Sequence, residues 1–141
     1  MNMNLSELEK EREKILKKIH QLGDMRSGSL SVRCQQCSKN PCVCHEPGHP
    51  GHGPIYSFST LVNGKTKIKN FKLSPELDKV RRETERYHVF KQLSHELIEV
   101  NNTICELRPV PHIADTRELE ELKKNLQRYF MKKYKRRLTG S

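Results

Sequence analysis

The sequence predicts an α+β protein that is mainly α, with an N-terminal helix, a cysteine-rich loop with a β-hairpin, a long helix of coiled-coil type and a basic C-terminal helix. Three observations predict this class. Apolar residues recur at helical steps in three segments, Asn63-Gly64 separates two strand-like runs, and four cysteines lie within eleven residues. Because only 33% of the 141 residues are hydrophobic, we expect elongated helices and a bound metal to compensate for a small core.

The chain divides into four expected segments. An amphipathic helix occupies residues 1–24, the cysteine-rich loop and hairpin occupy 25–73, the long helix occupies 74–108, and a linker with the basic helix occupies 109–141. The sequence contains no internal repeat, so the four segments differ in composition and pattern.

The first helix is expected over residues 5–22. Ser6 and Glu9 have the spacing of a capping box. An apolar stripe that needs a partner is formed by Leu8, Ile15, Ile19 and Leu22. Residues 23–54 are rich in Gly, Ser, Pro, Cys and His and show no periodic pattern. We therefore expect that segment to fold around a ligand or to stay loose.

Residues 55–72 change to a two-residue period on both sides of Asn63-Gly64, which predicts a β-hairpin with a type I′ turn. Three lysines, Lys65, Lys67 and Lys69, fall on one face of the second strand. Such lysines protect a sheet edge from aggregation, and they can also follow a phosphate backbone. We favour the first explanation, because it requires no ligand.

The long helix begins at Ser74-Pro75-Glu76, a cap followed by a first-turn proline and an acid, and is expected to reach about Leu107. Its second half has the a/d seam of a coiled coil or helical bundle, formed by Phe90, Leu93, Leu97, Val100, Ile104 and Leu107. The seam must pack on the N-terminal helix, on the C-terminal helix or on another copy of the chain.

The third helix is expected from a cap at Asp115 or Thr116 to about Arg137, with leucines on its apolar face. Tyr129, Phe130 and Tyr134 either stack on exposed bases or belong to the core side of the helix, and we favour the core side. The formal net charge of the chain is +10. Most of it comes from a run without acids that contains Lys123, Lys124, Arg128, Lys132, Lys133, Lys135, Arg136 and Arg137.

This basic run favours a polyanion, either nucleic acid or an anionic membrane surface. The alternative is a solvated helix end, which the negative C-terminal dipole of a helix also explains. We take nucleic acid, DNA over RNA, as the expected partner. We expect the basic run to be its main contact, and the hairpin lysines are the candidates for an additional one should they follow phosphates instead of only protecting the sheet edge.

The cysteine cluster predicts a zinc site, because thiolate and imidazole donors at close spacing select zinc over hard cations. One ligand set is Cys34, Cys37, Cys42 and Cys44. A second set replaces Cys34 with His52, so the fourth ligand is either Cys34 or His52. His45 and His49 are expected to be loop residues. A filled four-ligand site holds no reactive water and is therefore structural.

Several motifs occur in a distinctive order: Gly28-Ser29-Leu30, Arg33, Cys37-x4-Cys42-x-Cys44, His52-Gly53-Pro54, and Val62-Asn63-Gly64-Lys65-Thr66 before a Ser-Pro-Glu-Leu helix start. This order resembles the DUF6788-type family of small prokaryotic zinc-motif proteins, which are often encoded near transposases. The resemblance covers about residues 5–107. It implies that His52 completes the zinc site, whereas Cys34 lies outside the family pattern, and it suggests a mobile-element context without an established activity.

The leading functional hypothesis is a non-enzymatic zinc-binding accessory protein that binds nucleic acid non-specifically. The sequence contains no paired-carboxylate nuclease signature, phosphate loop or nucleophile elbow. The alternative is an oligomeric coiled-coil adaptor for a protein partner such as a transposase. We expect a cytoplasmic protein without a membrane partner, because no apolar run approaches the ~20 residues of a membrane span. Cys105 is expected to be a buried small hydrophobe.

Overall fold

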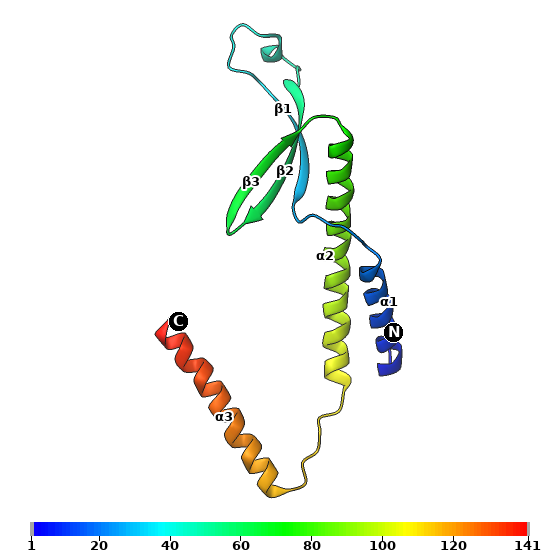
Figure 1. Cartoon of the computed structure of the whole chain (residues 1–141), viewed down its shortest axis with the longest axis vertical. Coiled ribbons are helices and arrows are strands. Elements are labelled where there is room, and N and C mark those ends of the chain that lie inside the picture. The colour runs from blue at the N-terminus through cyan, green and yellow to red at the C-terminus, as the bar shows by residue number, and fades with distance from the viewer. Residues whose placement is uncertain (1, 141) are drawn as a thin grey trace. The chain divides into compact units, whose positions relative to one another are not determined.

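The computed structural model describes residues 2–140 and confirms the mainly helical α+β class (Figure 1). The chain divides into two compact units, residues 1–107 and residues 108–141. The elements follow in the order α1 (Leu5–His20), β1 (Ser29–Gln35), a short 3-10 helix η1 (Val43–His45), β2 (His52–Val62), β3 (Lys65–Phe71), α2 (Pro75–Leu107) and α3 (Thr116–Thr139). The first six belong to the first unit.

The capping box of α1 lies two residues before the expected one. Asn4 Oδ1 accepts a hydrogen bond from the Glu7 backbone N–H at 2.9 Å, and the Glu7 carboxylate accepts one from the Asn4 N–H at 3.1 Å. The prediction of Ser6 and Glu9 was therefore wrong. Asn is as good an N-cap as Ser, and the pair Asn4 and Glu7 has the same three-residue spacing. The helix ends at His20, before the expected Leu22.

The sheet is antiparallel and has the order β1-β2-β3. The hairpin prediction is confirmed, and both turn residues have the positive φ that a type I′ turn requires, 52° at Asn63 and 77° at Gly64. The strand β1 was not predicted, because it lies in a segment expected to be a loop. Only Leu30 of β1 is partly buried, so backbone pairing with β2, rather than a buried face, defines this strand.

A small core joins the sheet to the start of α2. Phe58 of β2 and Phe71 of β3 pack with Val80 of α2, and all three side chains are buried. Gly28 crosses this core closely, with a φ of +146°, and a Cβ there would lie 2.5 Å from Cζ of Phe58. The residue before β1 must therefore be glycine, and this requirement fixes the path on which the chain enters the sheet.

A buried carboxylate ties the connection between α1 and β1 to α2. Glu83 lies 3.1 Å from Arg26 and 2.7 Å from Lys79, and its backbone carbonyl accepts a hydrogen bond from the Arg26 N–H. The Lys79 hydrogen bond lowers the pKa of Glu83 against the opposing effect of desolvation. Glu83 therefore stays charged and holds the segment that precedes β1.

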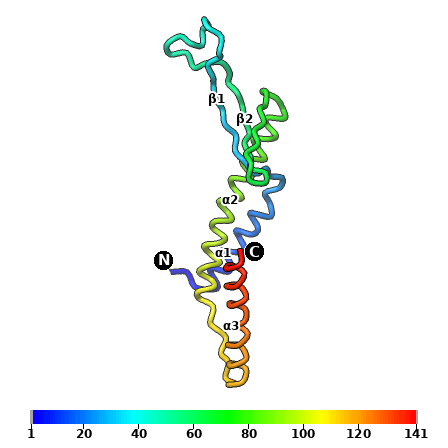
Figure 2. Tube along the Cα trace, turned by 90° about the vertical axis from the view of Figure 1, so that its left-hand side faces the viewer, coloured from blue at the N-terminus to red at the C-terminus, as the bar shows by residue number. Residues whose placement is uncertain are grey.

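The seam of α2 is covered by α1 of the same chain. The two helices lie side by side in both views, and Arg12 donates a hydrogen bond to Asn101 Oδ1 at 3.3 Å (Figures 1 and 2). Leu93 and Ile104 are buried, whereas Leu107 at the end of the helix is 49% exposed. Of the three expected partners, the N-terminal helix packs on this seam.

The two halves of α2 bury opposite sides. Thr84 is buried in the half that contacts the sheet, and Leu93 is buried in the half beside α1. Nine residues separate them, which corresponds to about two and a half turns of helix. One continuous helix thus joins the sheet to α1, and its own start is capped by Ser74 Oγ, which accepts a hydrogen bond from the Leu77 N–H at 3.2 Å.

The second unit contains α3, whose cap is Asp115, with Oδ1 accepting a hydrogen bond from the Arg117 N–H at 2.8 Å. Within the described residues α3 has no buried side chain, so the assignment of Tyr129, Phe130 and Tyr134 to a core was wrong. The apolar pattern of α3 allows burial but does not by itself produce it. Cys105 on α2 is also exposed, contrary to expectation.

Candidate metal centre

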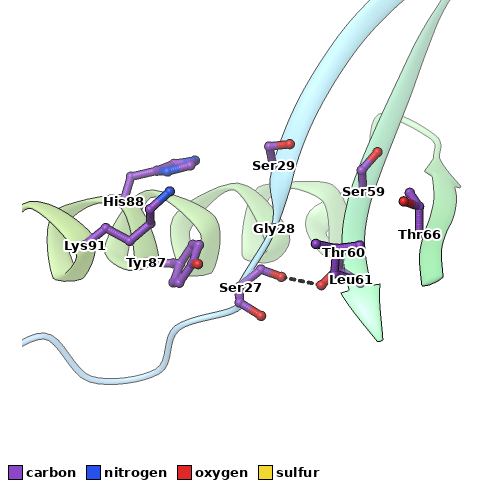
Figure 3. A pocket seen from close by; sticks show the side chains of 10 residues that line it. All are labelled: Ser27, Gly28, Ser29, Ser59, Thr60, Leu61, Thr66, Tyr87, His88 and Lys91. Atoms are coloured by element: carbon purple, nitrogen blue, oxygen red, sulfur yellow. Dashed lines mark hydrogen bonds between the residues drawn. The ribbon is translucent and has the colours of Figure 1, made fainter. Parts of the chain in front are cut away.

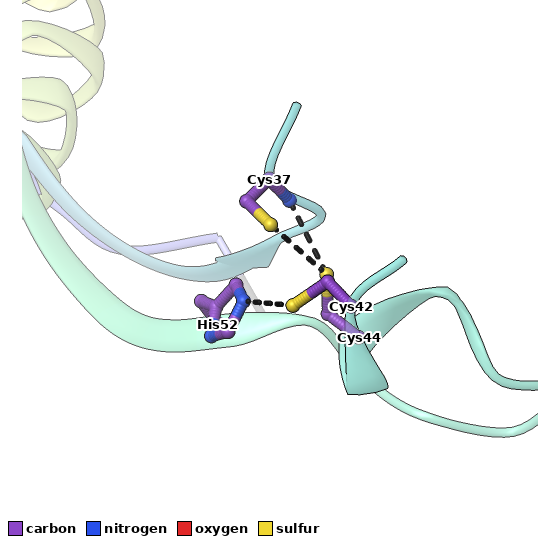
Figure 4. A group of neighbouring side chains, drawn as sticks. All are labelled: Cys37, Cys42, Cys44 and His52. Carbon is purple, nitrogen blue, oxygen red and sulfur yellow. Dashed lines mark hydrogen bonds between the residues drawn. The ribbon is translucent and has the colours of Figure 1, made fainter. Parts of the chain in front are cut away.

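The structure brings together Cys37, Cys42, Cys44 and His52 (Figure 4). Each residue offers one donor atom, and the four atoms lie within 4.8 Å of one another. Cys34 is exposed and does not belong to this group. Of the two ligand sets that the sequence allowed, the geometry therefore assembles the one with three cysteines and one histidine.

The four donors come from the loop between β1 and β2 and from its edges. Cys37 follows the end of β1, Cys42 and Cys44 lie at the start of η1, and His52 is the first residue of β2. The base of the loop is closed by the pairing of Gln35 with His52. This pairing brings a residue far along the chain beside the cysteines.

The donor separations suit a tetrahedral ion. Cys37 Sγ lies 3.5 Å from Cys44 Sγ, and Cys42 Sγ lies 3.2 Å from His52 Nε2. A zinc ion with bonds of about 2.3 Å to sulfur places tetrahedral sulfur atoms about 3.8 Å apart. These two separations are slightly shorter than that value, the other donor pairs lie within 4.8 Å, and the donor set of three thiolates and one imidazole is one that zinc uses.

Hydrogen bonds around the donors hold the loop in this arrangement. The Cys37 backbone N–H donates to Cys44 Sγ at 3.4 Å, and Cys44 itself is completely buried. His45 Nε2 lies 2.8 Å from the Cys37 carbonyl, and Gln36 donates to the Cys44 carbonyl at 3.2 Å. His45 thus acts as a loop residue here rather than as one of the four donors.

The thiols differ in their readiness to ionise. The pKa of Cys42 is lowered to about 6, first because the Cys44 backbone N–H donates to its sulfur and then because of His52. The pKa of Cys37 is raised, first by its hydrogen bond with Cys42 and then by that with Cys44. Cys42 is therefore the thiolate that is available first to a cation, and thiolates are the form in which cysteine binds metals.

The expected nucleic-acid contacts lie on separate surfaces. Lys65, Lys67 and Lys69 are exposed on β3, which is an edge strand, and Lys69 forms a 3.4 Å ion pair with Glu76. All eight lysine and arginine side chains of the basic run, residues 123–137, are exposed on α3. Within this run, Lys123 pairs with Glu120 at 3.3 Å and Lys133 lies 5.0 Å from the Tyr129 ring centroid.

Sequence reasoning missed a cleft of about 590 Å³ beside the start of β1 (Figure 3). We call it the hydroxyl cleft, and it is lined by Ser27, Gly28, Ser29, Ser59, Thr60, Leu61, Thr66, Tyr87, His88 and Lys91. Its lining comes from three stretches of sequence that the fold brings together. No motif within any one stretch signals it.

Comparison of the chain with family models, with curated proteins and with solved structures finds no match. In residues 2–140, no helix has both the length and the apolar character that crossing a membrane requires.

Proposed function

We propose that the chain is a non-enzymatic zinc-binding accessory protein that binds nucleic acid non-specifically through α3. Zinc has a structural role in this proposal. Cys37, Cys42, Cys44 and His52 are a full set of four donors, so a bound ion has no open position for a reacting water. The ion would close the loop between β1 and β2, whose own secondary structure is one three-residue turn of 3-10 helix.

The observation that supports nucleic-acid binding is the exposed basic run of α3, residues 123–137. Every residue of its basic run is accessible, and the run contains no acid. Four of the basic residues lie along one side of the helix, at steps of four, four and three residues: Lys124, Arg128, Lys132 and Lys135. A row of this kind matches a row of phosphates and reads no base sequence.

The resemblance to the DUF6788-type family adds a mobile-element context to the proposal. In that context the partner is DNA, and DNA is the nucleic acid we propose. The hairpin lysines form a separate basic group in the first unit, although Lys69 is partly neutralised by Glu76.

The test compares two fourfold variants that remove the same charge from opposite sides of α3. The first replaces Lys124, Arg128, Lys132 and Lys135 with Gln, and the control replaces Lys123, Lys133, Arg136 and Arg137 with Gln. Binding of the zinc-loaded chain to a labelled non-specific duplex is followed by fluorescence anisotropy at several salt concentrations. Each phosphate contact adds about 0.9 to the log–log salt slope, so four lost contacts reduce its magnitude by about 3.6.

We expect this loss in the first variant and a clearly smaller one in the control. Both proteins have the same net charge, so a difference between them identifies a binding side. Slopes that equal the wild-type slope in both variants would reject α3 as the nucleic-acid contact.

A second candidate function, an oligomeric adaptor for a helical protein partner, is favoured by the apolar side of α3. Leu119, Leu122, Leu126 and Tyr129 follow one another at helical steps, and each is exposed. The α2 seam is less suited to this role, because α1 already packs on it. Replacing Leu122 and Leu126 with Gln would abolish self-association or partner capture in sedimentation experiments if this function is correct, and would leave both unchanged if it is not.

A further inference from the structure

We propose that the hydroxyl cleft of the first unit is a second nucleic-acid site, which holds the phosphodiester backbone of a strand. This inference rests on the proposed function and extends it to a surface outside α3. The site would combine Lys91 and His88 of α2 with the serine and threonine hydroxyls of β1, β2 and β3. Lys67 is not a lining residue, but it follows the lining residue Thr66 on β3 and would add a charge where a bound strand leaves the cleft.

The fold places a histidine and a lysine on one side of the cleft and hydroxyl groups on the other. His88 and Lys91 project from α2 on one side of the Ser27–Ser29 stretch, and Ser59, Thr60 and Thr66 lie on the other (Figure 3). The Thr60 hydroxyl donates to the Ser27 carbonyl at 2.8 Å, which ties β2 to the chain that enters β1. This bond holds the hydroxyl side of the cleft against the Ser27–Ser29 stretch.

The register of the hairpin adds a row of lysines beside this cleft. Thr60, which lines it, pairs with Lys67, and Phe58 pairs with Lys69. Partners across an antiparallel pair lie on the same face, so the lysines share the face of Phe58, which packs towards α2. Lys67 therefore lies on the face of the sheet that carries Thr60, one residue along β3 from the lining residue Thr66.

The charge of the cleft favours an anion. Among the described residues that line it, none is acidic. Lys67 and Lys91 form no ion pair with an acidic side chain of residues 2–140; Lys91 Nζ lies 5.6 Å from the Tyr87 ring centroid. Serine and threonine hydroxyls are the polar groups that accompany lysine in contacts to phosphate oxygens. A phosphate thus finds both charge and hydrogen-bond donors here.

The spacing of the lysines favours a polymer over a single phosphate. Alternate residues of a strand repeat about every 6.8 Å, which is the step from Lys65 to Lys67 and from Lys67 to Lys69. A chain of phosphates can meet such a row of lysines one after another, whereas a single phosphate meets only one of them. An extended backbone can therefore pass from the cleft along the hairpin.

The experiment compares two double variants of the full zinc-loaded chain with the same labelled duplex. Lys67→Gln with Lys91→Gln removes two charges at the cleft, and Lys14→Gln with Lys18→Gln removes two from the exposed side of α1. All four lysines are exposed, so neither variant disturbs the core. We expect the magnitude of the salt slope to fall by about 1.8 in the cleft variant, at 0.9 per contact, and to change little in the control.

Lysine acylation of the wild-type chain, read by mass spectrometry, locates the contact independently. We expect the duplex to protect Lys67 and Lys91 from acylation and to leave Lys14 and Lys18 reactive. Binding that protects only α3 lysines, with an unaltered slope in the cleft variant, would overturn this inference and leave the proposed function standing. Binding that protects Lys67 and Lys91 but no α3 lysine would overturn the assignment to α3 instead, and a wild-type chain that does not bind would overturn both.

Discussion

Replacing His52 with Ala is expected to weaken metal binding, whereas replacing Cys34 with Ser is expected to leave it intact. His52 supplies one of four donors that lie within 4.8 Å of one another, and Cys34 supplies none of them. Removing even a partner that only supports a zinc ligand costs about 10–100-fold in affinity. We therefore expect the loss of the ligand itself to cost at least about tenfold.

The structural consequence of this loss should be confined to the metal loop. The helices α1, α2 and α3 contain 16, 33 and 24 residues, and all of them lie outside the loop. The loop itself contributes one helical turn of three residues. Circular dichroism at 222 nm should therefore remain close to the wild-type signal, while the loop amides lose their protection from hydrogen exchange.

The assay is the zinc content of each protein after dialysis against a competing chelator, measured by plasma mass spectrometry. We expect one zinc per chain in the wild type and in the Cys34→Ser variant, and a substoichiometric amount in His52→Ala. The reverse result, with zinc lost from Cys34→Ser and kept by His52→Ala, would refute the geometry and support the four-cysteine set. A wild-type protein purified under reducing conditions without stoichiometric metal would refute the zinc site altogether.

Two further predictions concern stability. Ile104 is 1% exposed beneath α1, so Ile104→Ala should lower the free energy of unfolding in urea by about 2–5 kcal/mol. Leu107 is 49% exposed, so the control Leu107→Ala should lower it by less than about 1 kcal/mol. Equal losses in the two variants would contradict the packing of α1 on the seam. The pKa of Glu83 is lowered in the folded chain by its hydrogen bond to Lys79, so its contribution is present above the ordinary carboxyl pKa of about 4.3 and is lost as the pH falls through the lower folded value. Glu83→Gln should therefore flatten the acid side of the melting-temperature profile, and an unchanged profile would contradict this role.

The elements with strong local signals could be predicted from the sequence. The start of α2 follows from Ser74 and Pro75, and the hairpin turn follows from Asn63-Gly64, because both depend on backbone preferences of single residues. The strand β1 could not be predicted in this way. Its side chains are mostly exposed, and its position depends on backbone pairing with β2, which no periodic pattern in the sequence indicates.

The sequence predicts that the cysteine cluster binds a metal, but it does not decide which residue is the fourth ligand. The cysteine spacing indicates a metal, but the choice between Cys34 and His52 depends on where the loop closes, and the pairing of Gln35 with His52 decides it. The exposure of the apolar side of α3 could not be predicted from the sequence either. An amphipathic pattern shows that a helix has a side suitable for packing, but it does not show that the chain provides a partner.

The most direct test of the proposed function is the salt dependence of duplex binding by the unmodified, zinc-loaded chain. The row of four bases on one side of α3 predicts a log–log slope with a magnitude of at least about 3.6, at 0.9 per phosphate contact, and little preference between unrelated sequences. A chain that does not bind duplex at low salt, or binds with a slope near zero, would contradict the account and leave the basic run as a solvated helix end.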